Sequence, residues 1–200
     1  MPKIKPKRST PRLDMTPMVD LAFLLVTFFM LTTKFRPVEP VAVDVPPSNA
    51  NIPKPERHVL LITIAQDGRT FIDLDGKFQR QQWAQDLNKD FKLNLNDDEI
   101  AKFSNMGPFG VPMSQLKSFI DMSTSEQKAF AQPGVPLDSA SMQLSNYVLY
   151  ARQADPEVRI AIKGDRDADF KVIHQVLKII QDKPNEINLF NLLTTMKVGI

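Results

Sequence analysis

The chain has 200 residues, of which 42% are hydrophobic and 24% are charged, and its formal net charge is only +2. This balance suits one folded domain of ordinary globular composition and says little about partners. The sequence has no cysteine, which excludes a disulfide framework and thiolate metal sites and leaves the cellular compartment open.

The chain begins with a basic tail, residues 1–12, that contains five basic residues and no acidic one. Prolines at positions 2, 6 and 11 predict an extended, disordered segment. Such a tail can contact nucleic acid or anionic lipid, but its place directly before an apolar stretch favours a role in membrane topology. Because positive residues stay cytoplasmic, we expect the chain beyond residue 35 to be exported, and we expect no nucleic-acid partner.

Residues 13–35 form the only apolar stretch long enough to cross a bilayer. A membrane core about 30 Å thick requires roughly 20 helical residues, each of which adds about 1.5 Å. The stretch therefore predicts a single transmembrane helix. A cleaved signal peptide is the alternative; the length of the stretch, its internal acid and the lack of a small-x-small cleavage site before Lys34 argue against it.

One acidic residue, Asp20, interrupts the apolar stretch. Pro17 suits the first position of a helix, so Asp20 could simply be a solvated acid in the first helical turn. If the buried span began only at Leu21, however, it would be about 20 Å long, which is too short. We therefore expect Asp20 to lie within the hydrocarbon region, where carboxyl groups usually mark a path for ions or protons.

Two threonines are predicted to share the helix face of Asp20. Thr16 lies one turn before the acid and Thr27 lies seven residues after it, so the three side chains form a polar face that begins beside Pro17. A threonine in a membrane helix can instead bond a carbonyl of its own helix, and this alternative stays open for Thr27.

Residues 36–57 form a linker with six prolines and no glycine. At a polyproline rise of about 3.1 Å per residue, we expect a stiff connection that reaches on the order of 70 Å from the membrane. Val41, Val43 and Val45 alternate with Ala42 and Asp44, which also permits a short strand that adds to the sheet edge of a partner.

Residues 58–200 predict a small exported α+β domain of two-layer α/β sandwich type, with helices on one face of a sheet. Strands at 59–64 and 70–74 form a hairpin around Asp67-Gly68, and a helix with one apolar face follows at 78–91. Later patterns predict a helix at 138–153, a strand at 158–162, a helix from about residue 168 that ends before Pro184, and a closing strand at 187–193.

The stretch at about 92–137 interrupts this order with short helical patches separated by loops. Ser123 and Glu126 have the spacing of a capping box. We expect an insertion of small helices rather than a second core, and the sequence leaves open whether it binds a partner or decorates the surface.

Alternating acids at 165, 167 and 169 have the spacing of a calcium loop. Phe170 and Val176, however, occupy the positions where that loop requires glycine and a closing glutamate. We therefore predict no calcium site and expect the acids to cap the helix that follows.

No residue pattern supports enzymatic chemistry. His58 and His174 have no partner at metal-ligand spacing, and no catalytic triad, phosphate-binding loop or zinc pattern occurs. We expect a protein that is not an enzyme and that has no cofactor other than protons as a coupling ion.

The segment Asp14-Met15-Thr16-Pro17-Met18-Val19-Asp20, followed by an apolar helix, resembles the signature of the ExbD/TolR biopolymer-transport family, which carries Thr-Pro-x-x-Asp after a short basic tail. Residues 62–76 look like the opening hairpin of that family, residues 159–165 like a strand that ends in Gly-Asp, and residues 170–194 like its last helix and strand. The chain departs from the pattern at 92–137, which compact members lack, and at Asp14, where many members have asparagine.

This resemblance implies a subunit of a proton-driven motor in the bacterial inner membrane, with its N-terminus in the cytoplasm and its domain in the periplasm. Two copies would lie within a ring of a multi-span partner similar to ExbB or TolQ, and Asp20 would carry the protons. The exported domain would dimerise and engage a TonB-like or TolA-like energy transducer or peptidoglycan. Two alternatives stay open: a passive membrane-anchored scaffold that binds peptidoglycan, and a flagellar-type stator subunit.

Overall fold

The computed structural model describes residues 15–33, 39–45, 47–48, 57–138, 141–182, 190–193 and 195–196. The chain divides into two compact units, Met1–Arg36 and Pro37–Ile200. The basic tail lies outside the described residues, as do the first two and the last two residues of the stretch at 13–35.

The first unit contains one helix, α1 (Thr16–Thr32), with Pro17 in its first turn. Leucine, phenylalanine and methionine dominate α1, and its backbone bonds continue to Thr33, whose N–H donates to the carbonyl of Phe29 at 3.0 Å. Of the helices in the described part of the chain, none is both long enough and apolar enough to span a membrane.

The second unit begins its fold with the predicted hairpin, β2 (Val59–Ile64) and β3 (Thr70–Leu74), which pair antiparallel. The Asp67-Gly68 turn is confirmed: Gly68 has a φ of +82°, a conformation that glycine adopts without steric cost. The N–H of Ala65 donates to the carbonyl of Arg69 at 2.9 Å and closes the turn.

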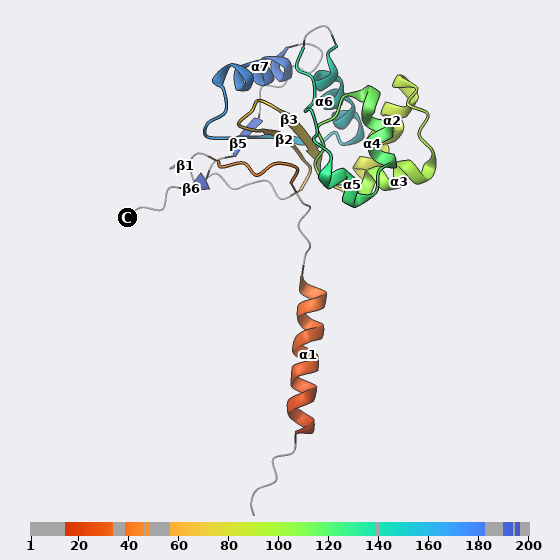
Figure 1. Cartoon of the computed structure of the whole chain (residues 1–200), viewed down its shortest axis with the longest axis vertical. Coiled ribbons are helices and arrows are strands. Elements are labelled where there is room, and N and C mark those ends of the chain that lie inside the picture. The colour runs from red at the N-terminus through yellow and green to blue at the C-terminus, as the bar shows by residue number, and fades with distance from the viewer. Residues whose placement is uncertain are drawn as a thin grey trace, which may run out of the picture. The chain divides into compact units, whose positions relative to one another are not determined.

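The main sheet has four strands in the order β3-β2-β4-β5. β4 (Arg159–Gly164) pairs parallel with both β2 and β5 (Phe190–Leu193). The helices α2 (Lys77–Phe91), α6 (Gln143–Ala154) and α7 (Phe170–Gln181) follow β3, precede β4 and follow β4, respectively. The predicted order of strands and helices, and the α+β class, are confirmed (Figure 1).

The core lies between one face of this sheet and the helices. Leu60 pairs with Leu74 and Ile160, and Ile62 pairs with Ile72 and Ile162, so these side chains point to the same face. They form one buried cluster with residues from the three helices, of which the most enclosed are Trp83, Leu87, Leu144, Tyr147, Val148, Val176 and Ile180. This arrangement is the two-layer sandwich that the hydrophobic pattern predicts.

The predicted starts of α6 and α7 differ from those in the structure. α6 begins at Gln143 rather than at 138, because Met142 has a left-handed backbone with a φ of +47° that breaks the helix. α7 begins at Phe170 rather than at about 168, because Asp169 is its N-cap and its side chain accepts from the N–H of Lys171 at 2.9 Å. The first three residues of the predicted strand at 187–193 lie outside the described residues.

The insertion contains α3 (Asp97–Asn105), α4 (Met113–Asp121) and α5 (Thr124–Ala129), which lie beside α2 and away from α7 (Figure 1). The capping box is confirmed, since Glu126 N–H donates to Ser123 Oγ at 3.3 Å and Ser123 N–H donates to Glu126 Oε2 at 2.7 Å. Of the two alternatives that the sequence leaves open, simple surface decoration does not describe this segment, because five of its large residues are at most 2% exposed and belong to the main core: Phe103, Phe109, Leu116, Phe119 and Ile120.

The insertion also covers the outer edge of β3. Phe109 pairs with Ile72 through two backbone bonds of 2.8 and 3.0 Å, and the N–H of Val135 donates to the carbonyl of Thr70 at 2.9 Å. The ring of Phe109 packs against Trp83 and Tyr147 at centroid distances of 5.7 Å each. The insertion therefore completes both the sheet edge and the core.

A second, two-stranded sheet pairs β1 (Pro47–Ser48) with β6 (Thr195–Met196) in parallel. The alternation at 41–45, which also permits a short strand on the sheet edge of a partner, forms no strand within this chain. The strand that does form in the linker lies a few residues later and pairs within the same chain. The alternation of side chains is nevertheless visible: Val41, Val43 and Val45 are half-buried, whereas Ala42 and Asp44 are exposed.

Candidate functional site

Asp20 lies in the second turn of α1, because the helix begins at Thr16 and has no acidic residue in its first turn. The alternative in which Asp20 is a first-turn acid beside the helix start therefore does not describe this helix. Asp20 is also the one charged residue within Thr16–Thr32.

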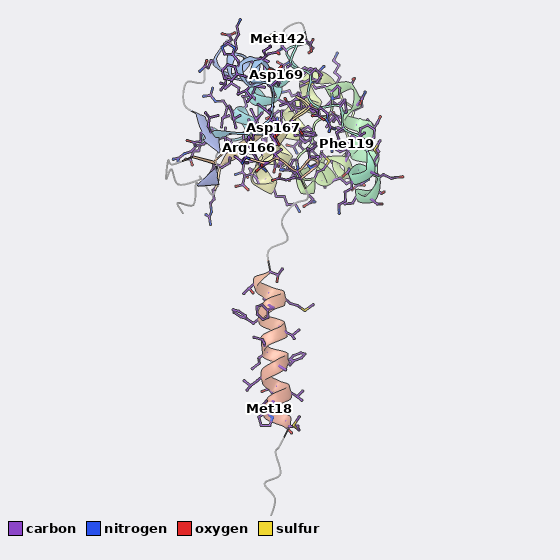
Figure 2. All side chains as sticks on the ribbon, turned by 60° about the vertical axis from the view of Figure 1, so that its left-hand side comes forward. Met18, Phe119, Met142, Arg166, Asp167 and Asp169 are labelled. Atoms are coloured by element: carbon purple, nitrogen blue, oxygen red, sulfur yellow. The ribbon has the colours of Figure 1, made fainter. Side chains whose placement is uncertain are left out.

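The surroundings of Asp20 on α1 are apolar. One turn on, the next residues on the same side are Phe23 and Leu24, which are 66% and 56% exposed. Every residue of α1 is exposed except Thr27, which is half-buried, so the helix presents apolar side chains on all sides (Figure 2). A helix that is apolar all round is typical of a segment that is enclosed by other proteins or by lipid.

The polar face predicted around Asp20 contains Thr16, Asp20 and Thr27 on one side of the helix, as helical spacing requires. The hydroxyl of Thr27 donates to the carbonyl of Leu24 at 2.9 Å, so it makes the bond to its own helix that was the open alternative. Thr32 does the same with the carbonyl of Phe28 at 2.8 Å. Of these three side chains, Asp20 alone carries an ionisable group.

The linker contacts its own domain at the end of β4. The ammonium of Lys163 donates to Glu39 at 2.6 Å, and Lys163 is on the sheet face opposite the helices, since it pairs with Thr63 rather than with the core residues. The N–H of Asp44 donates to the carboxylate of Asp165 at 3.0 Å, and the N–H of Arg166 donates to the carbonyl of Asp44 at 2.8 Å. Residues 39–45 are therefore held against the domain, in contrast to the free, fully extended connection that was predicted.

The acids at 165–169 have structural partners. Asp165 accepts from the N–H groups of Asp44 and Asp167, each at 3.0 Å, and Asp169 caps α7. Figure 2 labels Arg166, Asp167 and Asp169 in this loop. Within the described parts of the chain, no group of three or more histidine or acidic side chains is placed to hold a metal ion.

One pair of charged residues was not predicted. His58, which precedes β2, places its Nδ1 2.8 Å from the carboxylate of Asp155, 97 residues later. Sequence spacing gives no reason to pair these two residues, because they are 97 positions apart. The contact follows from the parallel pairing of β2 with β4. The signal in the sequence is weak: His58 directly precedes one predicted strand, and Asp155 lies three residues before another.

The fold and the site together define a class: a short apolar helix that carries one carboxyl group, followed by a small α+β domain. The chain belongs to the family described as Biopolymer transport protein ExbD/TolR, whose family model matches residues 6–194. Proteins of this family are non-catalytic subunits of biopolymer transport, are generally associated with membranes, and work with ExbB/TolQ-type and TonB/TolA-type partners. Searches of curated proteins and of solved structures found no match.

Proposed function

We propose that this protein is the ExbD-like subunit of an inner-membrane motor that couples the proton motive force to TonB-dependent transport or to another outer-membrane process. The observation that carries the proposal is Asp20, the one charged residue of α1, which lies in the second turn of an otherwise apolar helix. Membership of the ExbD/TolR family supports it.

In this proposal, the apolar stretch at 13–35 crosses the inner membrane once, with the basic tail in the cytoplasm and the domain in the periplasm. The helix α1 alone is about 25 Å long at 1.5 Å per residue, and a bilayer can thin around a short span at modest cost. A ring of partner helices similar to ExbB or TolQ would enclose the apolar sides of α1, and two copies of the chain would share the ring.

Asp20 would take up and release protons within that ring. An apolar surrounding favours the neutral form of a carboxyl group, and contact with water or a cation lets it ionise. Each proton that crosses the membrane supplies about 2.3 kcal/mol per 100 mV of potential. Because the neutral and the ionised side chain prefer different surroundings, proton flow would shift which position in the ring the helix occupies.

The linker would then transmit this movement to the periplasmic domain, which would engage a TonB-like or TolA-like transducer or peptidoglycan. Protons are the coupling ion in this proposal, and Thr16, Pro17 and Thr27 support the helix around Asp20. The contacts of Glu39 and Asp44 support a linker that passes force directly into β4 and the loop after it.

The test compares Asp20→Asn, which keeps the shape of the side chain but cannot ionise, with Asp20→Glu, which keeps the carboxyl group. Each variant is expressed together with the ExbB- or TolQ-like ring partner. The complex is purified and reconstituted into vesicles that contain a pH-sensitive dye. We expect both to co-purify with the ring partner, and we expect Asp20→Asn to abolish proton uptake that Asp20→Glu retains in part.

Equal activity in cells for wild type and Asp20→Asn would instead identify a passive anchor, and would end the motor proposal. The mass of the purified complex identifies the ring partner and the number of copies of this chain. If the ring partner is of flagellar type, the protein is instead a subunit of a flagellar-type stator.

A further inference from the structure

His58 directly precedes β2, and it is tied to the turn between α6 and β4. The carbonyl of His58 accepts from the N–H of Arg159 at 2.7 Å, and the imidazole Nδ1 lies 2.8 Å from Asp155 Oδ2. His58 has a φ of +55°, which is in the left-handed region that residues other than glycine seldom adopt. A non-glycine residue keeps such a conformation only when its surroundings hold it there.

Asp155 is an unusual partner, because its side chain is a carboxylate that is only 4% exposed. Besides the imidazole, it accepts from the N–H of Glu157 at 3.1 Å. Asp155 is also the C-cap of α6, where the helix dipole disfavours negative charge and favours a cation. A protonated His58 therefore compensates both the burial of the carboxylate and its position at a helix C-terminus.

The imidazole, in contrast, is 40% exposed and can exchange protons with solvent. Three acidic groups act on it: Asp155 at the end of α6, Glu157 in the following turn, with Oε2 4.0 Å from Nε2, and Asp75 after β3. The hydrogen bond to Asp155, followed by its negative charge, raises the pKa of His58 above its usual value of 6.5.

We propose that His58 and Asp155 form a pH-responsive latch that ties the residue before β2 to the turn before β4. The latch is closed when the imidazole is protonated. Because the pKa of His58 is raised in the folded protein, its contribution to stability is fully present below pH 6.5 and is lost as the pH rises through the higher pKa of the folded state. This inference does not depend on the proposed function.

The first test is a titration of the full-length protein in detergent micelles, followed by NMR of the histidine rings. The chain has only two histidines, so two ring signals are expected, and His174→Asn identifies the signal of the exposed His174. We expect His58 to titrate above 6.5. Titration of His58 at or below 6.5 would overturn the proposal.

The second test measures urea unfolding through the fluorescence of Trp83, the single tryptophan, which is fully buried in the domain. The wild type is compared across pH with His58→Asn, since asparagine tolerates a positive φ but does not titrate, and with His174→Asn as the matched control. We expect wild type and His174→Asn to lose stability as the pH rises, and His58→Asn to lack that part of the change.

The two tests must also agree with each other. His58 changes the folding equilibrium constant by a certain factor between the acidic and the basic limit. That factor equals ten raised to the difference between the pKa of His58 in the folded state and its pKa in the unfolded state. Identical pH profiles for wild type and His58→Asn would show that the contact is not a latch.

Discussion

Arg80, on α2, forms an ion pair with Asp73, on β3, although only 6% of the arginine surface is exposed. The same guanidinium donates to the carbonyls of Leu74, at the end of β3, and Met106, at the end of α3. One buried side chain therefore joins the sheet, the helix that follows it and the insertion. Burial lowers the pKa of Arg80 to about 10, so the group is still charged at neutral pH.

Replacement of Arg80 by glutamine is expected to lower the free energy of unfolding by about 3 kcal/mol, because it leaves Asp73 and two carbonyl groups without their partner. Urea unfolding followed by Trp83 fluorescence measures this loss. Lys89→Gln, at an exposed position of the same helix, is the control and should change stability by less than about 0.5 kcal/mol. Equal effects of the two substitutions would contradict a structural role for the Arg80 contacts.

Phe109→Ala is expected to cost about 3 to 5 kcal/mol, since the ring is 1% exposed and packs against Trp83, Phe103 and Tyr147. Phe78→Ala is the matched control, because the ring of Phe78 is 74% exposed. Amide hydrogen exchange of Ile72 gives a second measurement, since its N–H donates to the carbonyl of Phe109 at 2.8 Å. An Ile72 amide that exchanges as fast as a surface amide in the wild type would show that the insertion does not cover this edge.

The linker contact between Glu39 and Lys163 is expected to show a coupling free energy of about 0.5 kcal/mol in a double-mutant cycle. The side chains of Glu39 and Lys163 are 44% and 15% exposed, so the coupling should weaken as salt is added. The cycle uses Glu39→Gln, Lys163→Gln and the double variant, with urea unfolding at low and high ionic strength. A coupling of zero at low salt would mean that the linker is not held there in solution.

Thr27→Val is expected to leave proton uptake close to the wild-type rate, because the Thr27 hydroxyl is already engaged with the carbonyl of Leu24. Valine keeps the shape of the side chain, so the helix should pack in the ring as before. The vesicle assay that compares the Asp20 variants provides the measurement. Loss of uptake as complete as that of Asp20→Asn would give the Thr27 hydroxyl a direct part in proton transfer.

The sequence predicts the local parts of this fold well. The Asp67-Gly68 turn requires a conformation that glycine supplies, and the spacing of Trp83 and Leu87 can bury only one face of a helix. The capping box at Ser123 is likewise a contact between residues three positions apart. In each case, the residues that decide the structure are close together in the chain.

The parts that were missed depend on distant segments. His58 meets Asp155 because β2 and β4 are neighbours in the sheet, and Glu39 meets Lys163 because residues 39–45 lie against the end of β4. The sequence leaves the role of the insertion open, because Phe103 and Phe109 lie in short, irregular segments with no clear period. They are in the core because they pack against Trp83 on α2. No local sequence pattern reveals this contact.

The occupied edge of β3 limits how this domain can associate with other sheets. In the four-stranded sheet, β5 is the other terminal strand, so an additional strand can join from that side alone. A sheet that accepts neighbours at both edges can polymerise into fibres, whereas a sheet with one blocked edge stops once two sheets have met. By occupying the outer edge of β3, the loops that contain Phe109 and Val135 therefore deprive this sheet of the second open edge that fibre-like stacking requires.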